Sequence, residues 1–332
     1  MIHEPLTGLY VMDPDRFDDV YGPRERADIE RYLTIERPPC TAADLSAEVL
    51  AGVDVLVSSW GAPRLTADFL DSAPRLALVL YAAGSVRPVV TDASWARGVR
   101  IASAGSVIAD KVADFALAQI LYALKHGWRY VLTARRTGSA AVRRSELGTA
   151  GATVGLVSLG ATGRATARLL LRHGVRVLGY DPYVSDADAR AEGIEPASLD
   201  RVFAECDVVS LHAPLLDETR GMVDAALLRS MRPDATLVNT ARGGLVDEAA
   251  LVTVLRERPD LFAALDVTDP EPAVPGSPLF ELDNVVVTPH LAGSLGPERR
   301  LLGRAMAEDL ARYAAGRPLR HEVIAAAMEH AA

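Results

Sequence analysis

The stretch Thr-Val-Gly-Leu-Val-Ser-Leu-Gly-Ala-Thr-Gly-Arg occupies residues 153–164. Its first five residues are mostly apolar and predict a buried strand, and a helical pattern of apolar residues starts at Gly163. A strand, a glycine turn and a helix in this order bind the pyrophosphate of a dinucleotide, because the free N–H groups and the dipole at the helix N-terminus attract an anion. We therefore expect Gly160, Ala161, Thr162 and Gly163 to hold a pyrophosphate group.

Ser158 and Asp181 indicate whether the turn binds a dinucleotide and which one. Ser158 stands where the G-x-G-x-x-G fingerprint has its first glycine, so the turn alone is a weak signal. Asp181 lies 21 residues past Gly160, at the end of the next predicted strand. A carboxylate there accepts hydrogen bonds from the adenosine ribose and repels a 2′-phosphate, which predicts NAD rather than NADP. In an alternative interpretation, Asp181 only caps the Asp-Pro-Tyr turn that it begins.

Short apolar runs alternate with helical patterns from the glycine turn to about Leu291. The runs that predict strands are 153–157, 175–180, 207–211, 236–239, 262–267 and 284–288. Parallel strands need crossover connections, and near-continuous apolar runs indicate burial on both faces. The predicted fold class is therefore α/β with a doubly wound parallel sheet.

The first hundred residues repeat this alternation less regularly. Their predicted strands are 8–12, 54–58, 76–81 and 99–103, and longer helical patterns cover about 107–126 and 297–313. The last of these helices follows the final strand, so we expect the chain to return there to its first domain. This predicts a discontinuous substrate-binding domain of residues 1–104 and 296–332. The other domain spans residues 105–295 and is entered through a loop at about 133–150.

Composition and charge exclude several classes of protein. The 332 residues are 49% hydrophobic and 24% charged, which is typical of globular domains. A net charge of −9 gives no electrostatic footprint for nucleic acid or an anionic membrane. Cys40 and Cys206 lie far apart, and no histidine pattern suggests a metal site. Acidic residues stand where a signal peptide has its basic start, so we expect a cytoplasmic protein that binds no metal, nucleic acid or membrane.

Polar clusters follow three of the later predicted strands, at the strand ends where open parallel sheets bind ligands. The clusters are Asn-Thr-Ala-Arg-Gly-Gly at 239–244, Asp-Val-Thr-Asp-Pro-Glu-Pro at 266–272 and Thr-Pro-His-Leu-Ala-Gly at 288–293. With Leu-His-Ala-Pro at 211–214, they resemble the D-isomer-specific 2-hydroxyacid dehydrogenase family. The resemblance implies two Rossmann-like domains with the active site in the cleft between them, and a homodimer formed largely through the larger domains.

The resemblance assigns catalysis to Arg242, Glu271 and His290. It implies reduction of a 2-oxo acid to a (2R)-2-hydroxy acid by NADH, or the reverse. Arginine can donate at once to a carboxylate and the adjacent carbonyl. Histidine titrates near neutrality and can give the proton that the carbonyl oxygen needs, while a neighbouring glutamate favours the charged ring and holds it. Taken singly, each residue also fits an ordinary loop position.

Further residues are expected to line the cofactor and the small-molecule substrate. The cofactor set is Gly160, Ala161, Thr162, Gly163, Asp181, His212, Ala213, Pro214, Thr219, Thr240, Ala241, Asp266 and Gly293. Asp266 resembles the family residue that contacts the carboxamide end of the nicotinamide. Besides Arg242, the backbone of Ala83 and Gly84 is expected to bind the substrate carboxylate, and Trp60 is expected to form a wall of the pocket.

Two alternative functions stay open at this point. Corepressors of the C-terminal-binding type share the fold and the Arg, Glu and His, so a dinucleotide-sensing binding protein is one alternative. A formate or phosphite dehydrogenase of the same fold is the other, although the additional asparagine and extended N-terminal region expected for formate are not found in the sequence. The motifs do not specify which 2-oxo acid is the substrate.

Overall fold

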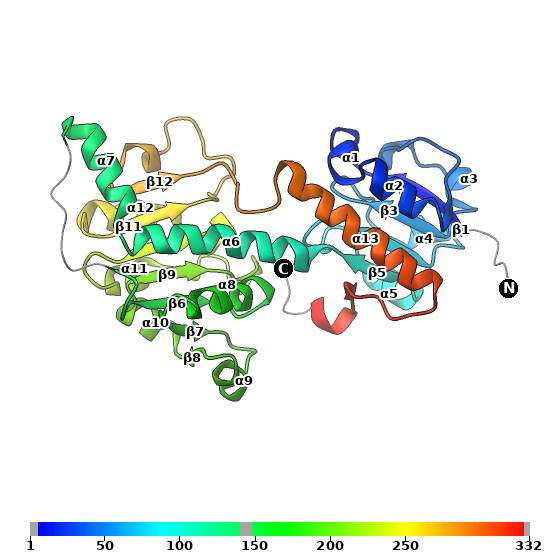
Figure 1. Cartoon of the computed structure of the whole chain (residues 1–332). Helices are drawn as coiled ribbons and strands as arrows, with labels where there is room; N and C mark the ends of the chain where they lie inside the picture. The colour runs from blue at the N-terminus through cyan, green and yellow to red at the C-terminus, as the bar shows by residue number, and fades with distance from the viewer. Residues whose placement is uncertain (1–5, 140–147, 329–332) are drawn as a thin grey trace. The chain divides into compact units, whose positions relative to one another are not determined.

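The computed structural model describes residues 6–139 and 148–328, which form two compact units (Figure 1). The described residues up to Ile108 and from Ser294 onward make up the first unit, and Ala109–Gly293 make up the second. The domain boundaries expected from the sequence, after residue 104 and before residue 296, lie within four residues of these limits.

The first unit is built on a mostly parallel sheet with the strand order β13-β5-β4-β3-β1-β2. Its strands are β1 (Leu6–Val11), β2 (Leu33–Thr34), β3 (Val55–Ser58), β4 (Leu78–Tyr81), β5 (Arg100–Ser103) and β13 (Glu322–Val323). Its shorter helices are α1 (Pro14–Val20), α2 (Pro23–Ile29), α3 (Ala47–Leu50), α4 (Ala67–Ser72) and α5 (Asp92–Ala96). β13 runs antiparallel to β5, whereas the other pairs are parallel. The four strands predicted for this region are present, and the two-residue strands β2 and β13 were not predicted.

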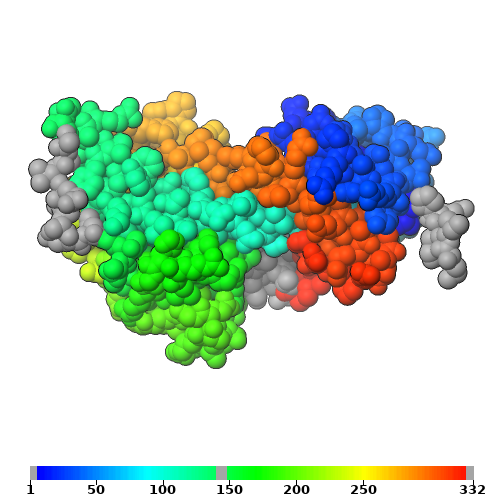
Figure 2. Space-filling view, in the orientation of Figure 1, coloured from blue at the N-terminus to red at the C-terminus, as the bar shows by residue number. Residues whose placement is uncertain are grey.

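Helix α13 (Arg299–Ala314) belongs to the first unit. Leu302 and Met306 are buried in one apolar cluster with Val20 and Tyr21. A Cβ atom on Gly303 would lie 2.2 Å from the Val20 carbonyl oxygen, so α13 packs directly on the backbone at the end of α1. Figure 2 shows its residues, in orange, against the blue N-terminal elements.

The second unit contains a seven-stranded parallel sheet within the described residues, with the order β12-β11-β10-β9-β6-β7-β8. The strands are β6 (Thr153–Val157), β7 (Arg176–Tyr180), β8 (Glu195–Pro196), β9 (Val208–Leu211), β10 (Thr236–Asn239), β11 (Phe262–Leu265) and β12 (Val285–Val287). The chain leaves β6 toward one edge and returns at β9 on the other side of β6. This reversal is the topological switch point at which doubly wound sheets bind ligands. The predicted α/β class and its six main strands in this unit are confirmed.

Helices cover both faces of this second sheet. The helices of this unit are α6 (Gly105–Ala123), which begins in the first unit, α7 (Gly127–Thr137), α8 (Ala161–Leu171), α9 (Asp186–Ala191), α10 (Leu199–Glu205), α11 (Ala225–Ser230) and α12 (Glu248–Glu257), and α7 buries no side chain. Val209 and Leu237 face the cluster formed with α10, α11 and α12, whereas their neighbours Val208 and Val238 face the cluster formed with α6 and α8. Successive strand residues point to opposite faces, which explains the unbroken apolar runs.

The connection between α6 and β6 differs from the prediction. The sequence predicted a loop from about residue 133, but α7 continues to Thr137. The remainder of the predicted loop, residues 140–147, lies outside the described residues. Among the helices that the structure describes, none is long and apolar enough to cross a membrane.

Candidate active site

Three strands of the second unit present their C-terminal ends at one edge of the sheet. Leu265 of β11 pairs with Asn239 of β10 and with Val287 of β12, so these parallel strands end together. Arg242 follows β10 closely, and Asp266 comes directly after β11. The polar clusters found in the sequence therefore meet at this edge.

Arg242 lies in a short loop that Asn239 fixes. The buried Asn239 side chain donates to the Arg242 carbonyl oxygen at 2.9 Å and accepts from the Ala241 N–H at 3.0 Å. A Cβ atom on Gly243 would lie 2.0 Å from the Thr268 carbonyl oxygen, so this glycine permits a close approach of two loops. The guanidinium donates to the Ala241 carbonyl oxygen at 2.6 Å. A guanidinium has about five N–H donors, so about four of them stay available within the residues that the structure describes.

His290 and Glu271 come together from the loops that follow β12 and β11. The Nδ1 atom of His290 lies within hydrogen-bonding distance of Glu271 Oε1. His290 has a φ of 54°, a left-handed conformation that is uncommon outside glycine and often found at functional sites. Its N–H donates to the Asp266 carbonyl oxygen at 2.9 Å, which holds the backbone in this conformation. The ring thus keeps its Nε2 atom for another partner.

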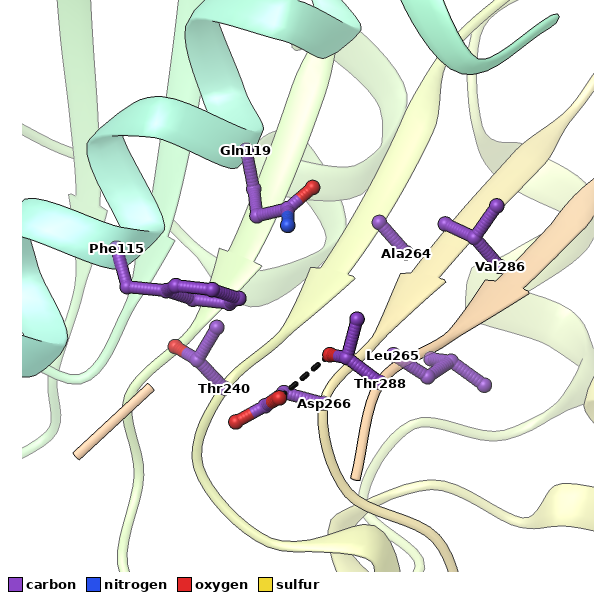
Figure 3. Close-up of a pocket in the computed structure, with 8 residues that line it drawn as sticks. All are labelled: Phe115, Gln119, Thr240, Ala264, Leu265, Asp266, Val286 and Thr288. Carbon is purple, nitrogen blue, oxygen red and sulfur yellow. Dashed lines mark hydrogen bonds between the residues drawn. The ribbon is translucent and has the colours of Figure 1, made fainter. Parts of the chain in front are cut away.

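Asp266 organises the loop that carries His290. Its Oδ1 accepts from the Leu291 N–H at 2.8 Å, and its Oδ2 accepts from the Ala292 N–H at 2.8 Å. Its Oδ1 also accepts from the Thr288 hydroxyl, the bond drawn in Figure 3. The residue is only 2% exposed. Its contacts with the protein are therefore those of a positioning residue, and the expected contact with the nicotinamide stays a prediction.

A small cavity lies beside this loop, between α6 and the strand ends. It is lined by Phe115, Gln119, Thr240, Ala264, Leu265, Asp266, Val286 and Thr288 (Figure 3). The Thr240 hydroxyl is buried and has no hydrogen-bond partner within residues 6–139 and 148–328. A buried hydroxyl without a partner beside a cavity is consistent with a ligand contact. Phe115 and Gln119 had no predicted role, because the sequence identified α6 only by its helical pattern.

The turn between β6 and α8 suits the pyrophosphate of a dinucleotide. Gly160 is the N-cap of α8, and Ala161, Thr162 and Gly163 form its first turn, whose N–H groups lack partners inside the helix. A Cβ atom on Gly163 would lie 2.1 Å from the Ser158 carbonyl oxygen, so only glycine fits there. No acidic side chain opposes an anion in the sequence of this turn.

His212 lies at the end of β9, next to this turn. Its N–H donates to the Val157 carbonyl oxygen at 2.8 Å, and its Cβ lies 3.7 Å from the place that a Gly163 Cβ would occupy. Both ring nitrogens are buried and find no hydrogen-bond partner in the part of the chain that the structure describes. Burial lowers the pKa of His212 to about 4, so the ring is uncharged at neutral pH. Its polar atoms fit a wall of the dinucleotide site rather than a proton donor.

Asp181 follows β7 and faces the same turn. Its Oδ2 accepts from the Leu159 N–H at 2.7 Å and from the Ser158 hydroxyl at 3.2 Å. Its Oδ1 accepts from the Tyr183 N–H at 2.8 Å, which is the turn-capping bond of the alternative interpretation. The carboxylate therefore caps its own turn and also lies against the turn between β6 and α8.

The remaining predicted cofactor residues lie in loops at the same end of the sheet. The Thr219 hydroxyl donates to the Pro214 carbonyl oxygen at 2.6 Å and accepts from the Leu216 N–H at 2.8 Å, which closes the loop that Ala213 begins after β9. Gly293 ends the second unit. The cofactor contacts of these residues stay predictions.

The residues expected to bind substrate lie at one edge of the first unit's sheet. β3 and β4 are parallel neighbours, with Ser58 opposite Tyr81, so the loops that carry Trp60 and Ala83 start together. The Ala83 N–H already donates to the Tyr81 carbonyl oxygen at 2.8 Å, and the Ser103 hydroxyl donates to the Gly84 carbonyl oxygen at 2.8 Å. Trp60 is 37% exposed. Their substrate contacts, and the expected cleft between the units, stay predictions.

Residues 117–292 match the family model of the NAD-binding domain of D-isomer specific 2-hydroxyacid dehydrogenases. This range contains the phosphate-binding turn, Asp181 and the loops of Arg242, Glu271 and His290. The chain belongs to the D-isomer specific 2-hydroxyacid dehydrogenase family. The family, the fold and the NAD cofactor predicted from the sequence are thereby confirmed.

Members of this dehydrogenase family are similar over most of the chain. The D-3-phosphoglycerate dehydrogenase of Mycobacterium leprae is 39% identical over 259 residues, which are 77% of this chain and 48% of that protein. The glyoxylate reductase of Korarchaeum cryptofilum is 34% identical over 286 residues, 85% of each chain. The crystal structure of the TT0316 protein from Thermus thermophilus aligns with a TM-score of 0.72 and 31% identity, covering 96% of this chain and 100% of that one. The chain spans about half the length of the phosphoglycerate dehydrogenases it matches.

Replacing Glu271 by Gln tests whether its contact with His290 holds the imidazole ring in position. The sequence predicts that His290 donates a proton to the substrate, and this needs a ring held in one orientation. Glutamine still offers an amide oxygen, but it lacks the negative charge of the carboxylate. In Glu271→Gln, kcat for 2-oxo acid reduction should therefore fall by about threefold to tenfold, as for one weakened hydrogen bond, while the dissociation constant of NADH stays near that of the parent. The effect will be modest, since the two side chains are 46% and 38% exposed and water screens the pair.

The control for this measurement is Glu257→Gln, which removes a carboxylate from an exposed ion pair with Arg229 on the same unit. Its kcat should match that of the parent protein. An unchanged kcat in Glu271→Gln means that Glu271 is an ordinary turn residue.

Proposed function

We propose that this protein is an NAD-dependent oxidoreductase that reduces a 2-oxo acid to a (2R)-2-hydroxy acid, or catalyses the reverse reaction. The observation that carries this proposal is the contact between His290 Nδ1 and Glu271 Oε1, with His290 on a loop fixed by Asp266 at the same sheet edge as Arg242. The likeness to a glyoxylate reductase over 85% of each chain supports the same reaction class.

When bound, the cofactor supplies a hydride to the carbonyl carbon. Negative charge then builds on the carbonyl oxygen, and the proton that neutralises it comes from His290 Nε2, because Nδ1 is engaged by Glu271. After the proton leaves, Glu271 keeps the ring oriented for the next one. Arg242 binds the substrate carboxylate and donates to the carbonyl oxygen, which both aligns the substrate and stabilises the developing charge.

A panel of 2-oxo acids tests the proposed activity. Glyoxylate, hydroxypyruvate and bulkier 2-oxo acids are mixed with the full chain and NADH, and the loss of NADH absorbance is followed, with NADPH run in parallel. We expect turnover of at least one acid with NADH. If no acid is reduced and no 2-hydroxy acid is oxidised by a protein that binds NADH, the proposal is wrong and a dinucleotide-sensing function replaces it.

Replacing Asp181 by Ser tests the preference for NAD. The carboxylate repels a 2′-phosphate, so its removal should lower the ratio of the NADPH to the NADH dissociation constant by about tenfold, the size expected for one nearby like charge. Asp200→Ser, an exposed acid on α10, is the matched control and should leave the ratio unchanged. An unchanged ratio in Asp181→Ser means that the carboxylate does not face the ribose.

We further propose that the protein is a cytoplasmic homodimer, an inference that rests on the family resemblance. Light scattering should then give twice the mass of the chain. The relatives named above support neither the corepressor function nor the formate or phosphite activity.

A further inference from the structure

We propose that Ser158 is a cofactor-specificity residue that acts with Asp181 as one unit to select NAD over NADP. The proposal rests on the NAD-dependent function given above. In the dinucleotide fingerprint this position is the glycine that makes the tight turn. Here a side chain is present, and its hydroxyl donates to the carboxylate of Asp181, to which the proposed function assigns the adenosine ribose.

The backbone at Ser158 would suit glycine better than serine. Its φ is 77°, in the left-handed region that disfavours residues with a Cβ atom. Two contacts hold the Ser158 backbone in this conformation. Its N–H donates to the Tyr180 carbonyl oxygen at 2.7 Å, and its own carbonyl oxygen packs on Gly163. The turn therefore imposes an unfavourable conformation on Ser158. Glycine would adopt it at lower cost, but glycine would not supply the hydroxyl.

The hydroxyl lies between the two parts of the dinucleotide site. It is 3.2 Å from Asp181 Oδ2 and 4.0 Å from the place that a Cβ atom on Gly160 would occupy, at the start of α8. Ser158 thus links the phosphate-binding turn to the carboxylate that discriminates between ribose and 2′-phosphoribose.

The hydrogen bond between Ser158 and Asp181 decides which acceptor sites stay open for a ribose. A carboxylate has about four lone-pair sites, and Oδ2 of Asp181 uses both of its sites on Leu159 N–H and the Ser158 hydroxyl. Oδ1 uses one on Tyr183 N–H, so one site remains among the bonds made by the described residues. The Ser158 oxygen has two lone pairs of its own and a single proton, which is committed to Asp181. Together the two side chains offer acceptors, which suits the two donor hydroxyls of a ribose.

A 2′-phosphate meets the opposite situation at the same place. It has only acceptor oxygens at high pH and carries negative charge, so it needs donors or a cation. The Ser158 proton is directed to Asp181. Arg164 is the cation nearest to Ser158 along the chain, and it donates to the Leu159 carbonyl oxygen at 2.7 Å and pairs with Glu192. Ser158 therefore strengthens the discrimination that Asp181 begins.

A double-mutant cycle on the full chain tests the proposal. The variants are Ser158→Ala, Asp181→Asn and the double variant, and the dissociation constants of NADH and NADPH are measured by fluorescence titration without substrate. In Ser158→Ala we expect the ratio of the NADPH dissociation constant to the NADH dissociation constant to fall by about three- to tenfold, as for the loss of one hydrogen bond. In the Asp181→Asn background, the same change should alter the ratio by less than about twofold, because the two residues act together.

Two further variants separate specificity from turn structure. Ser158→Gly also removes the hydroxyl but relieves the left-handed conformation, so the ligand-free protein should melt at a higher temperature than Ser158→Ala while showing the same change in ratio. Ser230→Ala removes a hydroxyl bonded to Leu227 at the end of α11 and should leave the ratio unchanged.

The proposal is overturned if Ser158→Ala weakens both cofactors equally, since the hydroxyl then only supports the turn. It is also overturned if the Ser158 effect persists undiminished in the Asp181→Asn background, or if the parent protein does not bind NADH. Because these measurements use no substrate, a failure of the 2-oxo acid panel with the cycle intact refutes the proposed activity and leaves this inference standing.

Discussion

Replacing His290 by Gln should lower kcat for 2-oxo acid reduction by about 10²–10⁴-fold across the whole pH range, the contribution typical of a general acid. Glutamine is a poor acid and cannot give up a proton to the carbonyl oxygen. The dissociation constant of NADH should stay near that of the parent, because the phosphate-binding turn and Asp181 lie on other loops. Stopped-flow or steady-state NADH oxidation measures the first quantity and fluorescence titration the second.

The left-handed backbone at His290 requires a second variant. Asparagine adopts φ values near 54° more readily than glutamine, so His290→Asn removes the ring with less strain on the loop that Asp266 holds. Both variants should lose turnover to a similar degree. Retention of activity within tenfold of the parent in either variant rules out His290 as the proton donor.

Replacing Arg242 by Lys should lower kcat/KM by about 10- to 100-fold, although the charge is kept. Lysine lacks the planar fork that can hold a carboxylate and polarise the adjacent carbonyl together. Binding of NADH should stay near normal, and both KM and kcat should worsen because the lost contacts serve binding and the transition state. Unchanged kinetics remove Arg242 from the site.

The matched control is Arg256→Lys, the same change at an exposed arginine of α12. Its kinetics should equal those of the parent. Since Asn239 fixes the Arg242 loop through backbone groups, the lysine variant should keep the loop and melt at nearly the parent temperature. A large fall in melting temperature would attribute the kinetic loss to the fold instead.

The sequence predicted the second unit well because each long strand is buried on both faces. Val208 and Val209, for example, face opposite clusters and are both apolar, so the strand appears in the sequence as one unbroken apolar run. The strands β8 and β13 are two residues long, too short to show any period. The sequence predicted a loop where α7 ends, because the last turn of this helix, Ala-Arg-Arg-Thr, is mostly polar and resembles a loop.

The candidate site was predictable in its residue types and not in its supporting bonds. Arg242, Glu271 and His290 follow from motifs at strand ends. The bonds from Leu291 and Ala292 to Asp266 join residues 25 and 26 positions apart, and no local pattern signals them. Ser158 was visible as a departure from the glycine fingerprint, but the reach of its hydroxyl to Asp181 depends on how β6 and β7 pair.

The return of α13 to the first unit has a consequence for synthesis on the ribosome. The second unit is continuous from Ala109 to Gly293, so all of its residues are made before α13 emerges. Until then, Val20 and Tyr21 lack the Leu302 and Met306 side chains that cover them in the finished molecule. The apolar side chains of α1 therefore stay uncovered until α13 has been made, and we expect the second unit to fold ahead of the unit that precedes it in the chain.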